Sequence, residues 1–260
     1  MLAEPNPMQG DLQFSVTSIP VRVSVWAWVA YAILGWNSTY DPIVSDSGPY
    51  KISRLAIWVL AVAFSILLHE LGHAWVYRLF GVESRIVLYH FGGLATPDGP
   101  GAYRTLTSMQ HIFVSAAGPA IQLALAGIAF GIVVLFRQTL SATEPGVFPF
   151  WSFLLQDLLL INIVWPLFNL LPVYPLDGGK ISRELFLMWN SSKGIQYSLM
   201  LSVITAGAVA VFFMKTNTFM GIMMLMFAVQ SYQTLQQYTG GGFGGGYGGY
   251  GGYGNDDSWR

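Results

Sequence analysis

Two histidines and a glutamate lie close together in an apolar part of the sequence, His69-Glu70-Leu71-Gly72-His73. Residues four apart share one face of a helix, so His69 and His73 can bind one metal ion. Glu70, between them, is placed to act as a base beside the metal rather than as a ligand. The alternative is a helix interior with two hydrogen-bonded histidines and a paired glutamate. However, the motif lies within Leu55–Phe80, which is long enough to cross a membrane, where ionisable groups are costly and usually functional.

A catalytic zinc site needs a third protein ligand, and the chain has no cysteine to supply one. His90 and His111 are candidates, although a lone histidine near a membrane interface is usually a structural residue. Asp177 is a stronger candidate, because two prolines break the chain before it and the two glycines after it allow close backbone approach. Asp177 could equally be the N-cap of a short helix over Gly178–Trp189, and the residues alone leave both interpretations open.

The composition is that of a membrane protein. Hydrophobic residues make up 53% and charged residues 10%, against roughly 25% charged residues in a typical soluble domain. The net charge of −1 gives no reason to expect nucleic acid as a partner. Six stretches of about 20 mostly apolar residues predict an all-α polytopic membrane protein embedded in the lipid bilayer. They are Val21–Trp36, Leu55–Phe80, Thr107–Phe136, Phe150–Val173, Ile195–Met214 and Phe219–Leu235.

Two segments favour β-structure instead. Leu12–Val23 alternates moderately, so the N-terminal segment, residues 1–20, is expected to contain a strand. Arg85–Phe91 is rich in β-favouring residues and is followed by Gly92 and Gly93. We expect a hairpin or re-entrant element there, near the active site, because irregular backbone at membrane depth needs cover from protein or from a water-filled cavity.

The basic residues predict the orientation. Placing the amino terminus in the cytoplasm assigns eight of the twelve Lys and Arg residues to the inner side, so both termini are expected to be cytoplasmic. The protein is expected to be multi-pass and to reside in the cell membrane. Residues 21–235 should form one transmembrane domain, and residues 236–260, rich in glycine and tyrosine, a flexible tail.

Two motifs together carry a resemblance to a known family. His-Glu-x-x-His at 69–73 and Asn-Leu-Leu-Pro-x-x-Pro-Leu-Asp-Gly-Gly at 169–179 resemble the site-2 protease family of intramembrane zinc metalloproteases. The six-span plan is closest to the compact sporulation-type branch of that family. A third family-like element is Ala-Gly-Pro-Ala-Ile-Gln at 117–122, in which Gln122 stands where the family commonly has Asn.

The resemblance implies roles for particular residues. His69, His73 and Asp177 would bind one zinc ion (Zn2+), and Glu70 would be the catalytic base. Asn169 and Pro175 match positions that affect substrate handling or contacts to the transition state. Further candidates for substrate or transition-state contacts are Gln122, Gly92 and Gly93.

The expected function is cleavage of a peptide bond within or next to a transmembrane segment of another membrane protein. The substrate is expected to be a single-span helix that unwinds at the site, because a helix hides its carbonyl groups in internal hydrogen bonds. A divalent-metal transporter is an alternative, but it predicts ionisable ligands along a continuous path, and the chain has four histidines in all. A second alternative is a non-catalytic membrane scaffold, which the intact set of catalytic positions disfavours.

Overall fold

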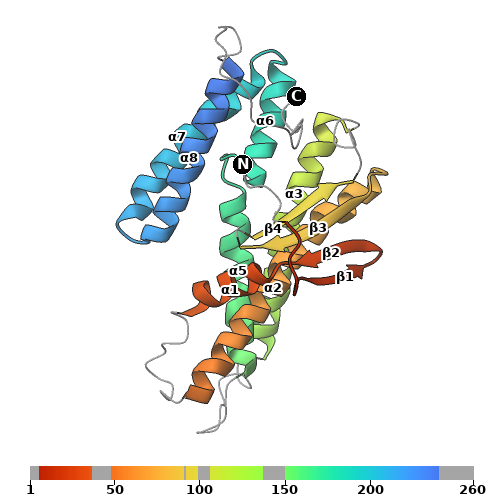
Figure 1. Ribbon diagram of the computed structural model, residues 1–260, viewed down its shortest axis with the longest axis vertical. Coiled ribbons are helices and arrows are strands. Elements are labelled where there is room, and N and C mark those ends of the chain that lie inside the picture. Colours follow the sequence, from red (N-terminus) through yellow and green to blue (C-terminus); the bar gives the residue numbers. More distant parts are fainter. Residues whose placement is uncertain (1–5, 37–47, 91, 99–105, 137–149, 240–260) are drawn as a thin grey trace. The chain divides into compact units, whose positions relative to one another are not determined.

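The computed structural model describes residues 6–36, 48–90, 92–98, 106–136 and 150–239 (Figure 1). The chain divides into two compact units. One contains all the strands, and we call it the sheet unit; it comprises residues 2–98 and 117–168. The other, which we call the helical unit, comprises residue 1 and residues 99–116 and 169–260.

Among the described residues, four helices are long and apolar enough to cross a membrane: α2 (Gly48–Leu79), α3 (Ser108–Leu135), α5 (Phe150–Asn169) and α7 (Gly194–Met214). They match four of the six predicted spans. The apolar helix α1 (Val25–Gly35) has 11 residues, about 16 Å in length against a hydrocarbon core of about 30 Å. The helix α8 (Thr218–Thr239) has 22 residues but is not among the four. A count of six spans is therefore not confirmed.

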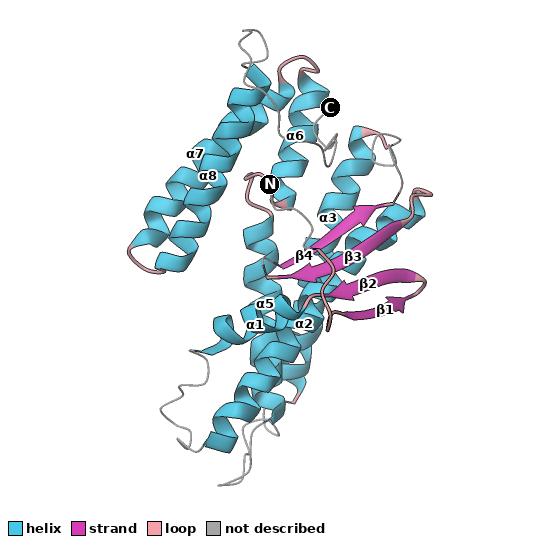
Figure 2. Cartoon of the chain, in the orientation of Figure 1, coloured by secondary structure: helices cyan, strands magenta, loops and turns pink. Residues whose placement is uncertain are grey.

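The strands found in the described ranges form one four-stranded sheet in the order β1-β2-β3-β4 (Figure 2). Their bounds are Leu12–Val16, Ile19–Val23, Ser84–Tyr89 and Gly92–Pro97. The outer pairs are antiparallel hairpins, and β2 runs parallel to β3. The hairpin predicted around Arg85–Phe91 is thus confirmed, and the single strand predicted over Leu12–Val23 is in fact a hairpin. The first predicted span began too early, because residues 21–23 pair with β3.

The core of the sheet unit lies between the sheet and α1 and α2. Helix α2 packs against β3 and β4, and α1 packs against α2 and β3 (Figure 1). Burial of these apolar side chains removes them from solvent and holds the sheet against the helix that carries the histidine pair. The most buried members are Ile19, Ala27, Tyr31, Ile66, Ala74, Ile86 and Leu88.

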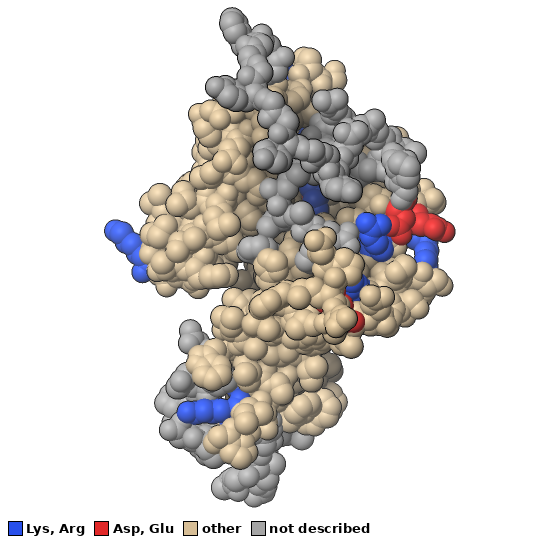
Figure 3. All heavy atoms as spheres, viewed as in Figure 1, with Lys and Arg blue, Asp and Glu red and all other residues tan. Residues whose placement is uncertain are grey.

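A carboxylate fixes the start of the sheet unit. Asp11 accepts hydrogen bonds from the backbone N–H groups of Met8 (3.1 Å) and Val25 (3.2 Å) and pairs with Arg22 (3.2 Å). These bonds, the Met8 bond foremost, hold the pKa of Asp11 below its ordinary value. Among the described residues on the face drawn in Figure 3, most atoms are tan and so belong to residues that are neither acidic nor basic.

In the helical unit, α7 and α8 lie side by side (Figure 1) and α6 (Asp177–Trp189) packs against α7. Small residues at intervals of four, Ser198, Ser202, Ala206 and Ala210, are buried along α7. Such a stripe lets two membrane helices approach closely. Helix α8 continues through Thr239 and so includes residues 236–239 of the predicted tail. Residues 240–260 lie outside the described residues.

Candidate active site

The two histidines of α2 direct ring nitrogens to the same point. Nε2 of His69 and Nε2 of His73 are 3.0 Å apart, and the two rings are inclined at 81°. Both side chains are buried. Two nitrogens bound to one tetrahedral zinc ion at about 2.05 Å would be about 3.3 Å apart. The spacing of the pair therefore fits two ligands of one zinc ion with little adjustment.

Gln122, on α3, orients the first histidine. Its Oε1 lies 2.8 Å from Nδ1 of His69, and its Nε2 donates to the backbone carbonyl of Ser65 at 3.1 Å. Because a carbonyl can only accept, the amide oxygen must face His69, so the ring carries its proton on Nδ1. The lone pair of Nε2 of His69 can then bind a metal ion. Gln122 is fully buried.

A glycine on α3 makes room for both rings. A Cβ at Gly118 would lie 2.6 Å from Cε1 of His73 and 2.8 Å from Nε2 of His69, closer than side chains tolerate. A glycine of α2 is packed equally closely against α3, since a Cβ at Gly72 would lie 2.8 Å from the carbonyl oxygen of Ala117. The helices α2 and α3 therefore cross at van der Waals distance through these glycines. The element at 117–122 thus provides both space for the histidines and the partner of one of them.

Glu70 lies against the start of β4. A Cβ at Gly93 would be 2.5 Å from Oε1 of Glu70, so the carboxylate occupies the space that a side chain would need. Gly92 adopts a φ of +125°, which favours glycine. Its carbonyl accepts a long hydrogen bond (3.5 Å) from Tyr31, a buried residue of α1. A sheet edge and a base are therefore adjacent.

Two residues of this network were not identified from the sequence. Ser65 and Asn162, both fully buried, are joined by a bond of 2.8 Å from Nδ2 of Asn162 to Oγ of Ser65. Asn162 also donates to the carbonyl of Leu158 in its own helix, α5. A signal was present for Ser65, because it lies four residues before His69 and so on the same face of α2. The polar network therefore links α2, α3 and α5.

Asp177 is the first residue of α6, in the helical unit, and its side chain is buried. The N-cap position belongs to Leu176, whose side chain makes no capping hydrogen bond. The alternative role of Asp177 as an N-cap is therefore wrong, because the helix begins one residue earlier than Gly178. Oδ1 of Asp177 accepts a bond of 3.1 Å from Nζ of Lys180.

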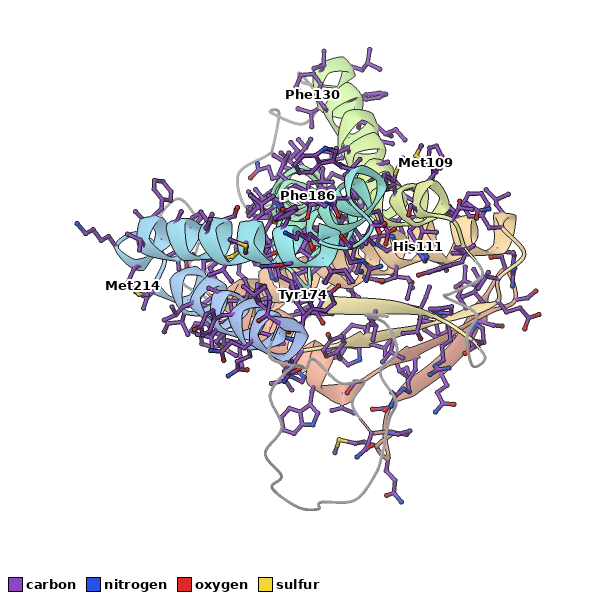
Figure 4. All side chains as sticks on the ribbon, turned by 90° about the horizontal axis from the view of Figure 1, so that it is seen from above. Met109, His111, Phe130, Tyr174, Phe186 and Met214 are labelled. Atoms are coloured by element: carbon purple, nitrogen blue, oxygen red, sulfur yellow. The ribbon has the colours of Figure 1, made fainter. Side chains whose placement is uncertain are left out.

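The other predicted residues are divided between the units. The sheet unit brings together His69, His73, Glu70, Gln122 and Gly93. Asn169 and Pro175, which belong to the helical unit with Asp177, are half-buried at the end of α5 and in the segment before α6. Of the two alternative ligands, His90 is exposed and packs edge-on against Tyr89, whereas His111 is buried near the start of α3 (Figure 4).

Comparison with known proteins gives one family. The model of peptidase family M50 matches residues 57–144. YwhC of Bacillus subtilis is 32% identical over an alignment of 161 positions that covers 52% of this chain and 72% of YwhC. Stage IV sporulation protein FB of Bacillus subtilis is 29% identical over 149 residues, 57% of this chain and 46% of that protein.

The fold has a match among solved structures. The site-2 protease from Methanocaldococcus jannaschii superposes with a TM-score of 0.52 and 20% identity, covering 86% of this chain and 95% of that one. Among the curated relatives, two that are named as zinc metalloproteases are matched over 38% and 34% of their own length. The chain thus spans about a third of the length of these relatives.

Proposed function

Because the chain belongs to peptidase family M50, the family of the site-2 proteases, we propose that it is an intramembrane zinc metalloprotease. It is an integral membrane protein, and the part of the chain that the structure describes has four helices long and apolar enough to cross a bilayer. Its reaction is hydrolysis of peptide bonds within or next to transmembrane segments of other membrane proteins. The observation that carries the proposal is the convergence of His69 and His73 within one apolar helix.

The proposed ligands of one zinc ion are His69, His73 and Asp177. Two imidazoles and a carboxylate leave a fourth position open, as catalytic zinc sites require. All three side chains are buried, and a bound cation would add to the compensation that the ammonium group of Lys180 gives the Asp177 carboxylate. When bound, zinc supplies a Lewis acid that polarises the scissile carbonyl group and acidifies water.

Glu70 is the proposed general base. Its carboxylate takes a proton as water attacks the scissile carbon, and then gives that proton to the nitrogen of the leaving amine. Support comes from its position, because Glu70 is next to His69 in the chain and lies against Gly93 of β4. The close contact with a backbone that has no side chain holds the carboxylate in one place.

The substrate is proposed to be a membrane protein that unwinds at the site and adds as a strand to β4. β4 is the last strand in the sheet order, so its outer N–H and C=O groups have no strand partner among the described residues. An extended chain can pair with such an edge. Gly93 lies on this strand beside Glu70, so a substrate paired with β4 would pass the base.

Supporting roles follow for the remaining candidates. Asn169, the last residue of α5, is proposed to donate a hydrogen bond to the substrate backbone or the developing oxyanion. Pro175 shapes the segment that precedes Asp177, and Gln122 fixes the tautomer of His69. Gly92 and Gly93 let the substrate strand and Glu70 approach the same backbone.

The active site is proposed to open to the cytoplasm, where both termini lie, in a protein of the cell membrane. Glu70 is about 14 Å from the end of α2 at Leu79, at 1.5 Å per residue. Water must therefore reach it through the protein rather than through lipid. The bias of basic residues supports this orientation.

The experiment compares membrane-protein fragments in cells that produce wild-type protein or the Glu70→Gln variant. Glu83→Gln is the matched control, because Glu83 is exposed before β3. Wild-type protein and the control should generate the same new fragments. In cells with Glu70→Gln the amount of these fragments should be about 10²–10⁴-fold lower, which is the contribution of a general base. Equal fragment levels with Glu70→Gln protein would contradict the proposal.

A further inference from the structure

The segment between α5 and α6 is neither helix nor strand, so its backbone N–H and C=O groups need hydrogen-bond partners other than those of regular secondary structure. Within Leu170–Leu176, the N–H of Val173 donates to the carbonyl of Leu171 (2.7 Å), and the N–H of Leu176 donates to the carbonyl of Val173 (2.8 Å). The two prolines of the segment have no N–H. Irregular backbone at membrane depth is stable only where such bonds are complete.

Tyr174, in the middle of this segment (Figure 4), is held by two serines from other helices. Its N–H donates to Oγ of Ser202 on α7 at 3.1 Å, and its carbonyl accepts from Oγ of Ser231 on α8 at 3.3 Å. Both serines are buried, with exposed fractions of 1% and 0%. The hydroxyl of Ser202 donates its own proton to the carbonyl of Ser198 at 2.9 Å, so it is free to accept from Tyr174.

The first turn of α6 rests directly on the same backbone. A Cβ at Gly179 would lie 2.6 Å from the carbonyl oxygen of Val173 and 2.7 Å from the nitrogen of Tyr174. A Cβ at Gly178 would overlap the backbone of Leu170 and Leu171. Because these two glycines lie directly against the backbone of the segment, a shift of the segment would also shift the first turn of α6, which begins with Asp177.

From this chain of contacts we propose that Ser202 and Ser231 are positioning residues that hold Asp177 in place to bind the metal ion. The inference rests on the proposed function of Asp177 as a zinc ligand. The proposed role does not require either serine to contact the metal or the substrate. They act through the backbone of Tyr174 and through the contact of Gly179 with it.

The test uses Ser202→Ala, Ser231→Ala and the double variant in the full-length protein purified in detergent. The first readout is zinc affinity, measured by competition with a chelator. Partners that orient a metal ligand usually contribute 10–100-fold in affinity, so a loss in that range is expected, largest in the double variant. Ser202→Thr keeps the hydroxyl and should restore affinity.

The second readout needs no metal. The chain has no cysteine, and Val173 is completely buried, so a Val173→Cys background reports loosening of the segment. Its labelling by a thiol reagent in zinc-free protein should be at least about tenfold faster when the serines are alanines, because an orphaned N–H favours open states. Unchanged labelling would overturn the proposal.

Two matched control variants distinguish loss of the serine bonds to Tyr174 from general loss of a hydroxyl group on α7 or α8. Ser198 on α7 and Thr234 on α8 carry hydroxyls that bond within their own helices, to Ile195 and Gln230. Ser198→Ala and Thr234→Ala should leave zinc affinity and labelling unchanged. If the controls lower zinc affinity as much as the serine variants do, general packing explains the effect and the proposal is wrong.

Asp177→Asn separates failure of this inference from failure of the proposed function. If Asp177→Asn loses zinc while both serine variants keep wild-type affinity, the serines are not positioning residues and the proposed function stands. If Asp177→Asn keeps zinc at wild-type affinity, Asp177 is not a ligand, and the metal-positioning role falls with it.

Discussion

Nδ1 of His69 lies 2.8 Å from Oε1 of Gln122, which determines the nitrogen through which this histidine can bind a metal. The second hydrogen bond of the amide, to the carbonyl of Ser65, prevents the amide from turning over. Gln122 therefore performs the orienting task although it is one methylene longer than the Asn that the family commonly has.

Gln122→Leu should lower zinc affinity or activity by about 10–100-fold, because it removes the partner that fixes the tautomer of His69. Gln122→Asn should retain part of the zinc affinity. It keeps the amide, but its side chain is shorter, so the amide oxygen would lie farther from Nδ1 of His69 by about the length of one C–C bond. Chelator competition on purified protein measures both. Gln156→Leu, at an exposed position of α5, is the control. Wild-type affinity in Gln122→Leu would contradict the orienting role.

Gly118→Ala should lower zinc occupancy strongly while the helices stay folded. The new methyl group would occupy the space of the His69 and His73 rings, and neither can move without leaving the metal position. Gly127→Ala, on the same helix, is the matched control because a Cβ there meets nothing within 4 Å. It should stabilise the helix by up to about 1 kcal/mol. Zinc analysis and circular dichroism of the two variants check this, and full zinc in Gly118→Ala would show that the rings have spare room.

Arg54 and Asp157 form a buried pair between α2 and α5, with N–O distances of 2.5 and 2.7 Å. The guanidinium also lies 4.7 Å from the ring centroid of Phe153. Arg54→Met or Asp157→Leu alone should destabilise the protein by about 3–5 kcal/mol, because each leaves an unpaired buried charge. The double variant should recover most of this loss. Thermal unfolding in detergent measures it, with Lys215→Met at an exposed position after α7 as control. Additive losses would show that the two charges do not interact.

The sequence predicted the long helices well because their apolar stretches are themselves the signal. Helix α3 begins one residue after the start of the predicted span and ends one residue before its end. The first span was placed less well, since residues 21–23 join a strand whose partner, β3, is some sixty residues away, and tertiary pairing overrides local pattern.

Pairing between distant residues also explains why some polar positions could not be predicted. Asp157 pairs with Arg54, which lies 103 positions away in the sequence, and both side chains are buried. The role of Gln122 depends on where α2 and α3 cross, which no local pattern contains. By contrast, His69 and His73 were predictable as a pair, because the spacing of four residues on one helix brings them together without help from the rest of the fold.

X-ray absorption at the zinc edge on purified protein, with Asp177→Asn measured in parallel, tests the proposed zinc site most directly. We predict one zinc ion per chain, with two imidazole nitrogens and a carboxylate oxygen in its first coordination shell and no sulfur. Asp177→Asn should change the oxygen contribution and lower the zinc content. A first shell of three imidazoles, or a spectrum and zinc content unchanged by Asp177→Asn, would contradict the proposed site.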